Sequence, residues 1–99
     1  MKRAVSVSSR VVVTKDQVST DLGDEVAIMS LKGGSYYGLE AVGARIWSLI
    51  QEPRTVDEVR NILVSEYEVE PERCERDLIV LLQGLADEGL VEVRDEHSR

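Results

Sequence analysis

The stretch from Gly34 to Trp47, Gly-Ser-Tyr-Tyr-Gly-Leu-Glu-Ala-Val-Gly-Ala-Arg-Ile-Trp, marks the point where the chain changes from strands to helices. It begins within a Lys-Gly-Gly turn, in which the paired glycines supply the positive φ that a tight hairpin requires. Its second half carries apolar residues at helical spacing. We therefore expect strands up to about Leu39 and helices after it.

Three strands are predicted before this boundary. Val11–Thr14 is a β-branched run, and Glu25–Leu31 is a second apolar stretch that ends at the glycine turn. Ser35–Gly38 forms a short third strand, whereas the polar residues 15–24 are expected to form a loop. The third strand would lie at the edge of one antiparallel sheet.

Three helices are predicted after the boundary, the first over about residues 41–50. Thr55-Val56-Asp57-Glu58 is a capping box that begins the second helix. Glu70-Pro71 begins the third, with proline at the first helical position. Gly89 is a candidate C-cap before a short strand at 90–93. The sequence therefore predicts an α+β fold, a three-stranded antiparallel sheet followed by three helices in a winged-helix-like arrangement.

Length and charge limit the classes of function. Ninety-nine residues fit one domain, residues 1–99, with an ordered core over about residues 10–93. The 12 basic and 19 acidic residues give a net charge of -7, which repels phosphate and argues against nucleic-acid binding. No apolar run approaches the roughly 18 residues of a transmembrane helix, and the N-terminus lacks a signal-peptide pattern. We expect a cytoplasmic protein without a membrane partner.

The residues available for catalysis are few. Cys74 is the only cysteine, and the only histidine, His97, is close to the C-terminus. These two residues exclude an internal disulfide and leave almost nothing for a nucleophile pair or a metal site. Cys74 lies at a core-facing position of the third helix, where burial favours an inert thiol. We expect no enzyme activity, no catalytic residue, no metal and no cofactor.

The predicted third strand has an unusual edge. Native proteins usually protect an exposed strand edge with charge or proline, but Ser35, Tyr36, Tyr37 and Gly38 carry no charge. Such an edge can accept a peptide as an additional strand. The alternative is that the third helix or the final strand covers it, and the residues alone do not decide between the two.

The third helix offers a groove beside this edge. Its core stripe consists of Cys74, Leu78, Leu81, Leu82 and Leu85. A neighbouring stripe at helical spacing consists of Arg73, Asp77, Val80 and Gly84. Glycine inside a helix costs about 0.5–1 kcal/mol relative to alanine, and close backbone approach is one reason for it. The opposite flank, with Ile79 and Ala86, is a rival, and ordinary helix packing explains either stripe.

The sequence around the boundary resembles the precursor-recognition proteins of lasso-peptide biosynthesis. Tyr-Tyr-Gly-Leu at 36–39 runs into Gly-Ala-Arg-Ile-Trp at 43–47, as in that family. The later leucines and Gly-Leu-Val at 89–91 are similar to its third helix. These proteins belong with the pyrroloquinoline-quinone biosynthesis chaperones and other RiPP recognition elements. The resemblance covers residues 10–93, and Glu40 departs from it, because the family often has Asn or Asp there as a helix cap.

The resemblance implies a peptide-binding function. The leader segment of a precursor peptide would lie as an added strand on the third strand, against the third helix, with a Tyr-x-x-Pro-type motif in an apolar pocket. The strand side of this site would be Ser35, Tyr36 and Tyr37, and the helix side Asp77, Val80, Leu81 and Gly84, with Arg73 from the same flank. The implied partners are the lasso precursor, a transglutaminase-like leader peptidase and an asparagine-synthetase-like cyclase.

Two other functions stay open. A winged-helix DNA-binding regulator would need a basic third helix, whereas this one carries Glu72, Glu75, Asp77, Asp87 and Glu88 against Arg73 and Arg76. A scaffold subunit would hold a partner enzyme without binding peptide directly. Binding of an isolated leader peptide would separate capture from scaffolding.

Overall fold

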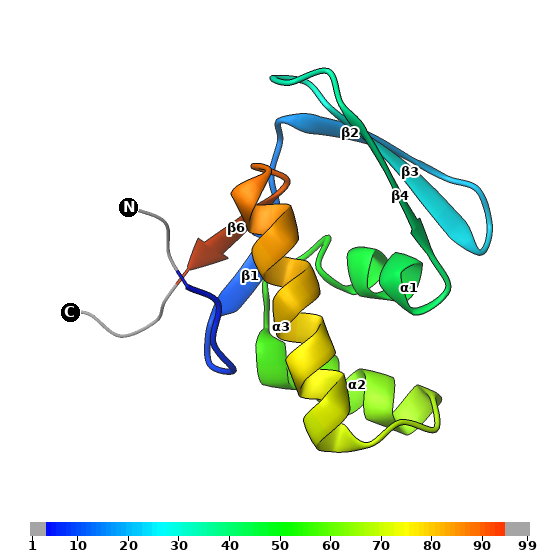
Figure 1. Cartoon of the computed structure of the whole chain (residues 1–99), viewed down its shortest axis with the longest axis vertical. Coiled ribbons are helices and arrows are strands. Elements are labelled where there is room, and N and C mark those ends of the chain that lie inside the picture. The colour runs from blue at the N-terminus through cyan, green and yellow to red at the C-terminus, as the bar shows by residue number, and fades with distance from the viewer. Residues whose placement is uncertain (1–3, 95–99) are drawn as a thin grey trace.

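The computed structural model describes residues 4–94 and confirms the α+β class, with two three-stranded antiparallel sheets and three helices (Figure 1). The elements in chain order are β1 (Arg10–Val13), β2 (Gln17–Asp21), β3 (Glu25–Ser30), β4 (Tyr36–Glu40), α1 (Val42–Leu49), β5 (Arg54–Thr55), α2 (Val56–Glu66), α3 (Pro71–Asp87) and β6 (Val91–Arg94).

The sheet next to the strand-to-helix boundary has the order β2-β3-β4. The predicted first strand, β1, is not part of it, because β1 pairs with β5 and β6 in a separate sheet. The third strand of the boundary sheet comes instead from residues 17–21, inside the stretch expected to be a loop. That prediction was wrong because β2 is an exposed edge strand, with no apolar alternation to reveal it.

The ends of the helices follow the local sequence signals. Thr55 Oγ1 accepts a hydrogen bond from the Glu58 amide, and the Glu58 carboxylate accepts one from the Thr55 amide, so the capping box is confirmed. Gly89, with φ of 79°, follows α3. Its amide donates to the Ala86 carbonyl and the Leu90 amide donates to the Leu85 carbonyl, which is the Schellman pattern.

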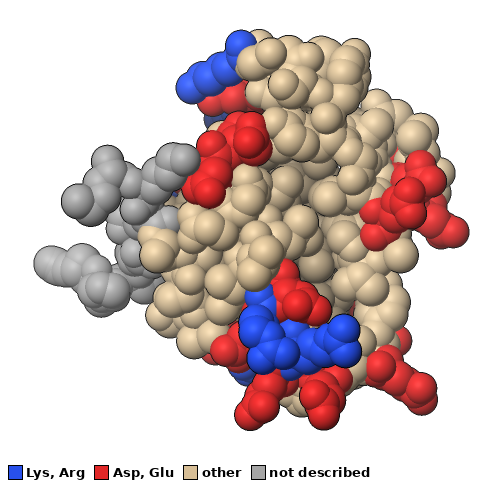
Figure 2. All heavy atoms as spheres, viewed as in Figure 1, with Lys and Arg blue, Asp and Glu red and all other residues tan. Residues whose placement is uncertain are grey.

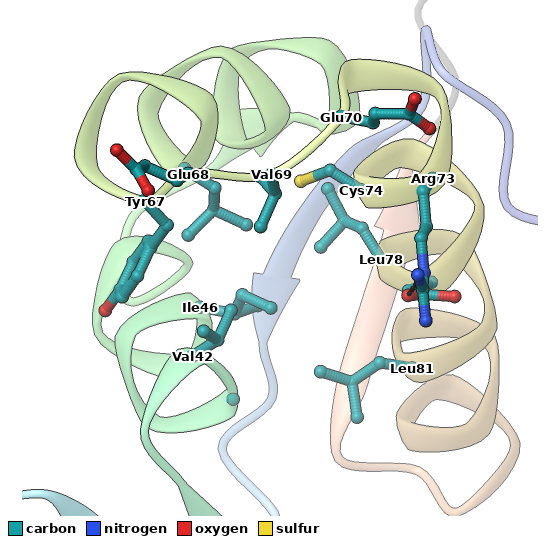
Figure 3. A pocket seen from close by; sticks show the side chains of 13 residues that line it. Val42, Ile46, Tyr67, Glu68, Val69, Glu70, Arg73, Cys74, Leu78 and Leu81 are labelled. Atoms are coloured by element: carbon teal, nitrogen blue, oxygen red, sulfur yellow. Dashed lines mark ion pairs between the residues drawn. The ribbon is translucent and has the colours of Figure 1, made fainter.

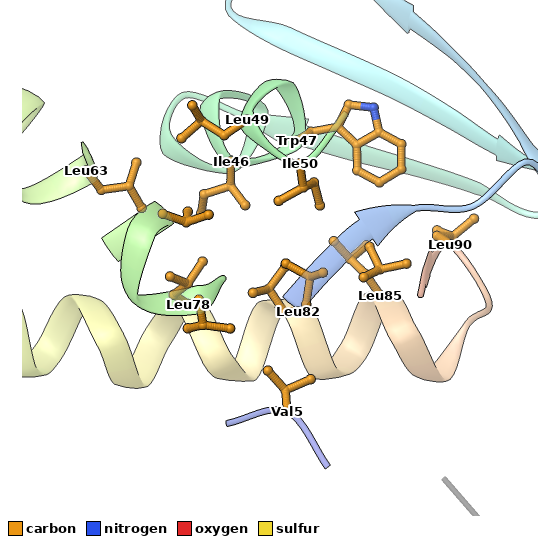
Figure 4. Packing of buried hydrophobic residues seen from close by; sticks show 14 of the residues in the cluster. Val5, Ile46, Trp47, Leu49, Ile50, Leu63, Leu78, Leu82, Leu85 and Leu90 are labelled. Carbon is orange, nitrogen blue, oxygen red and sulfur yellow. The ribbon is translucent and has the colours of Figure 1, made fainter. Parts of the chain in front are cut away.

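One aliphatic core joins the two sheets through the helices (Figure 4). Val26 and Ile28 of β3 face inward, and Trp47 of α1 is 3% exposed beneath the sheet. The Trp47 indole N–H donates to Ser19 Oγ at 3.3 Å, which ties α1 to β2. The boundary stretch therefore places a helix directly against the inner face of β2-β3-β4.

Helix α3 is buried along Leu78, Leu82 and Leu85, while Cys74 and Leu81 are only half-buried. Figure 4 shows Val5 on the side of α3 away from α1. Val5 is 8% exposed, and its amide donates to Gln83 Oε1 at 2.9 Å. Packing therefore extends to residues before the expected core of 10–93.

Candidate functional site

Strand β4 is an edge strand whose outer side has no neighbouring strand among residues 4–94. Hydrogen bonds beyond both ends of the β3–β4 pair fix its orientation. The Ser30 amide donates to the Ser35 carbonyl, and the Ala41 amide donates to the Asp24 carbonyl, each at 2.8 Å. Inward and outward groups alternate along an antiparallel strand, so every second residue of β4 turns its N–H and C=O outward. These residues are Tyr36, Gly38 and Glu40.

The side chains of β4 divide in the same way between the two faces of the sheet. Tyr37 and Leu39 are half-buried against the core, whereas Tyr36 is 74% exposed on the other face. Gly38 has no side chain, and a Cβ built there would meet nothing within 4 Å. The edge therefore offers unpaired backbone groups, with no charged side chain before Glu40.

Tyr37 connects this strand to the C-terminal end of α3. Its hydroxyl donates a hydrogen bond of 2.6 Å to the Glu88 carboxylate. This hydrogen bond raises the pKa of Tyr37 above its ordinary value, and partial desolvation and the Glu88 charge act in the same direction. The bond closes one end of the space between β4 and α3.

A cavity of about 550 Å³ lies between α1, the residues that connect α2 to α3, and the N-terminal half of α3 (Figure 3). This volume is within the range of roughly 300–1,000 Å³ found for ligand pockets. Val42 and Ile46 of α1 face Leu78 and Leu81 of α3 across it. Tyr67 and Val69 complete its apolar lining.

The cavity begins where β4 ends. Gly43 of α1 lines it, and a Cβ built at Gly43 would lie 3.4 Å from the Leu39 Cβ. A side chain larger than that of alanine would push α1 away from β4. A strand added along β4 toward its C-terminal end would run toward this cavity.

Charged groups lie on the α3 side of the cavity. Arg73 Nε lies 3.9 Å from Asp77 Oδ2, and both side chains are about three-quarters exposed, at 75% and 73%. Such an exposed pair contributes little to stability and is free to exchange partners. Burial raises the pKa of the Cys74 thiol, and the nearby Asp77 charge adds to this effect, so the thiol stays protonated at neutral pH.

The structure brings together most of the predicted site residues. Ser35, Tyr36 and Tyr37 lie at or beside β4, and Arg73, Asp77 and Leu81 line the cavity. Gly84 is exposed one helical turn before Glu88, on the flank that faces Tyr37. Val80 lies elsewhere: it is 68% exposed and shares a separate shallow pocket with Ile79.

Several lining residues were missed by the sequence reasoning. Val42, Ile46 and Tyr67 were not among the predicted site residues. Val69, which is 42% exposed, carried one signal, because it is an isolated apolar residue in an acidic stretch just before Pro71. The cavity is formed by three segments that are distant in sequence, so no single periodic pattern reveals it.

The described residues hold no group of three or more His, Cys, Asp or Glu side chains suited to a metal ion. His97 lies outside them. Within the same part of the chain, no helix is long and apolar enough to cross a membrane. Figure 2 shows acidic side chains at several places on one face, and one basic group bordered by acidic ones over the lower part of α3.

Comparison with known proteins gives a family match. The model of the family Coenzyme PQQ synthesis protein D (PqqD) matches residues 25–91. No curated protein matches the chain.

Three solved structures share the fold. TbiB1 in complex with the TbiA(beta) leader peptide has a TM-score of 0.78 and 36% identity, covering 89% of this chain and 99% of that one. Lasso peptide synthetase B1 complexed with the leader peptide has a TM-score of 0.74 and 23% identity, over 83% and 96%. The PqqD truncation of Methylobacterium extorquens PqqCD, a stand-alone RiPP recognition element, has a TM-score of 0.72 and 20% identity, over 90% and 95%.

Proposed function

Because this chain belongs to the PqqD family, we propose that it binds the leader segment of a ribosomal precursor peptide by strand addition to β4. TbiB1, which is 36% identical, was solved in complex with a leader peptide. The observation that carries the proposal is the open edge of β4. Its outward N–H and C=O groups at Tyr36, Gly38 and Glu40 provide a hydrogen-bonding register for an added strand.

The cavity beside β4 can make binding specific for particular leader sequences. Backbone hydrogen bonds supply affinity for any extended chain, whereas side-chain pockets supply specificity. The apolar lining around Val42, Ile46 and Leu81 suits the aromatic and proline side chains of a Tyr-x-x-Pro-type leader motif. Arg73 and Asp77 can pair with charged leader residues at the rim.

We propose a set of site residues along β4 and the facing flank of α3. They are Ser35, Tyr36 and Tyr37 on the strand side, and Arg73, Asp77, Leu81 and Gly84 on the helix side. Val80 stays a candidate only for a leader long enough to pass over the exposed surface of α3.

We propose that other proteins catalyse the cleavage and cyclisation of the precursor. The described residues offer a protonated, half-buried Cys74 and no arranged nucleophile or metal site. We therefore propose that the chain presents the leader to a transglutaminase-like peptidase and an asparagine-synthetase-like cyclase, which together produce a lasso peptide. In this scheme the chain is a non-catalytic, cytoplasmic recognition subunit.

Titration with the isolated leader peptide tests the proposal. Fluorescence anisotropy should show saturable binding of the leader and none of a scrambled leader of the same composition. Amide hydrogen exchange should slow at Tyr36, Gly38 and Glu40, which have outward N–H groups, more than at Tyr37 and Leu39, which already bond to β3. Saturable binding with unchanged exchange at those three amides would rule out strand addition, and a leader that does not bind would end the proposal.

A further inference from the structure

Residues 67–70, which connect α2 to α3, form one wall of the cavity beside β4. All four line the cavity, and Tyr67 is half-buried against the core. The backbone leaves α2 at Tyr67 in an extended conformation, with φ of -127° and ψ of 154°. The side chains of this segment form no hydrogen bond or ion pair with any residue from 4 to 94. The position of the wall therefore depends on packing and on how its two ends are fixed.

An ion pair fixes the α2 end of this wall. Glu66 is the last residue of α2 and immediately precedes Tyr67. Its carboxylate accepts two hydrogen bonds from the Arg45 guanidinium of α1, at 2.9 Å from Nε and 2.7 Å from Nη2. Arg45 Nη1 also donates to Ser48 Oγ at 3.2 Å, which holds the guanidinium against α1. Because a planar guanidinium that bonds both carboxylate oxygens fixes direction as well as distance, the pair sets where α2 ends relative to α1.

Tyr67 separates two cavities. The second, of about 510 Å³, lies on the opposite face of α1, where Ala44 and Arg45 line it. Val42 and Ile46, on the other face of the same helix, line the cavity beside β4. Of the described residues, Tyr67 alone lines both cavities, and Figure 3 shows its ring beside α1, across the cavity from α3. Since Arg45 lies on the side of the second cavity, the ion pair supports Tyr67 from behind.

The ion pair affects the position of this wall more than the stability of the fold. The side chains of Arg45 and Glu66 are both 37% exposed, and ion pairs at such exposure contribute little to the free energy of unfolding. The hydrogen bonds from Arg45 lower the pKa of Glu66, so the carboxylate is ionised and paired at neutral pH. Without the pair, the protein would stay folded but the end of α2 that carries Tyr67 would be released. Dispersion contacts weaken steeply with distance, so even a small displacement of the wall loosens its contact with a bound side chain.

We propose that Arg45 and Glu66 are positioning residues for leader recognition, because their ion pair holds Tyr67 as the wall against which an aromatic leader side chain packs. This inference rests on the proposed function, in which the cavity receives an apolar side chain of the leader. Contact between two rings favours an aromatic side chain over an aliphatic one of similar size. With the pair intact the cavity ends at Tyr67, whereas without it the space continues toward the second cavity. The pair therefore determines how closely the cavity fits its occupant.

Binding of p-cresol, the side-chain analogue of tyrosine, tests this wall without any peptide. Methyl resonances of Ile46 and Leu81, which line the cavity, report the affinity by nuclear magnetic resonance. Glu66→Gln keeps the shape of the side chain but removes its charge, and it should weaken p-cresol binding at least threefold. The Ala44 methyl should not respond to p-cresol in the wild type. It should shift in Glu66→Gln, because Tyr67 no longer separates the two cavities.

A second ion pair supplies the matched control. Glu75 of α3 pairs with Arg60 of α2, and its side chain is 34% exposed, close to the value for Glu66. Glu75→Gln makes the same chemical change at a carboxylate that does not adjoin Tyr67, so p-cresol affinity should stay within twofold of wild type. Arg45→Lys keeps the positive charge but loses the planar fork, and its p-cresol affinity should lie between those of wild type and Glu66→Gln.

The leader peptide gives an independent readout. Alanine substitution of each apolar leader residue in turn identifies the anchor, which is the residue whose loss weakens binding to the wild type most. The effect of losing the anchor should be at least threefold smaller in Glu66→Gln and unchanged in Glu75→Gln. General damage to the fold would not produce this difference, since it weakens binding of the leader with and without its anchor alike.

The outcomes separate this wall from strand addition. Wild-type p-cresol affinity in Glu66→Gln with a silent Ala44 methyl, equal losses in Glu66→Gln and Glu75→Gln, or no p-cresol binding by the unmodified chain would each overturn the role of the pair. Such a result with normal leader binding would leave the proposed function intact. A leader that fails to bind while p-cresol binding still depends on Glu66 would keep the wall and reject the proposed function.

Discussion

The hydroxyl of Tyr37 on β4 donates a 2.6 Å hydrogen bond to the carboxylate of Glu88, just beyond the end of α3. The two residues are 51 positions apart in the chain, and their bond spans the space between the open strand edge and the helix. Gly84 lies one turn earlier on the same flank of α3, so the bond borders the groove at that end. A leader strand added to β4 would therefore enter a space with a fixed boundary.

The bond between Tyr37 and Glu88 predicts a pH dependence. The carboxylate stabilises the protonated phenol, so the pKa of Tyr37 in the folded protein lies above the ordinary 10.0. A raised pKa means that this stabilisation is complete below about pH 10, the unfolded value, and is lost as the pH rises through the folded pKa. A pH titration of Tyr37, monitored by nuclear magnetic resonance, should give a pKa above 10.0. The substitution Glu88→Ala should return the pKa of Tyr37 toward 10.0. An unchanged midpoint in Glu88→Ala would show that the bond is absent in solution.

The orientation of the β4 edge predicts that Tyr36→Pro weakens leader binding at least tenfold, about 1.4 kcal/mol. Proline removes the outward N–H of Tyr36, and no bond to β3 is lost, because that amide faces the free edge. Ser19→Pro on β2 is a demanding control. Ser19 also faces the outer edge of its strand, and the substitution additionally removes the hydroxyl that accepts from Trp47, yet it should leave leader affinity close to wild type. Anisotropy measures the affinity, and circular dichroism checks the fold of both variants. Equal losses in the two would point to general damage to the sheet.

Ala41, immediately before α1, has a φ of 50° and a ψ of -115°, which L-residues rarely adopt. Glycine carries no such penalty, so Ala41→Gly should raise the free energy of unfolding by about 1 kcal/mol. Ala44→Gly, inside α1, should lower it by about 0.5–1 kcal/mol through helix propensity. Urea denaturation of the two variants measures both values. The idea of strain at Ala41 fails if both substitutions destabilise the protein.

Local signals in the sequence predicted local structure well. Features that depend on residues only a few positions apart were predicted correctly. These are the capping box at Thr55 and Glu58, the proline at the start of α3 and the C-cap at Gly89, which has a positive φ. The family was also identified from the sequence, because Tyr-Tyr-Gly-Leu at 36–39 and Gly-Ala-Arg-Ile-Trp at 43–47 resemble its members. The family match confirms that prediction.

Features that depend on residues distant in the chain could not be predicted from the sequence. Most side chains of β2 are exposed, so their pattern indicates neither a strand nor its pairing partner. The cavity depends on how α1, the segment before α3 and α3 itself meet, which is set by packing of the core. Val80 shows the same limit. A helical wheel places it near Asp77 and Gly84, whereas in the structure it is 68% exposed and lines a separate pocket with Ile79.

Gly84 provides the sharpest test of the groove on α3. A Cβ built at this glycine would meet nothing within 4 Å, so the space beside it is open and a side chain there does not clash with the fold. Gly84→Ala should therefore raise the free energy of unfolding by up to about 1 kcal/mol through helix propensity, with only a small change in leader affinity.

Gly84→Leu should gain similar helix stability but fill the space between α3 and β4 that the leader would occupy. We expect leader affinity to fall at least tenfold, about 1.4 kcal/mol, although the protein is no less stable than wild type. A gain in stability combined with a loss of binding excludes unfolding as the cause. Gly84→Leu with wild-type affinity, tested beside Leu81→Glu at the cavity, would show that the leader stays within the cavity and does not pass over Gly84. Wild-type affinity in both variants would remove α3 from the site.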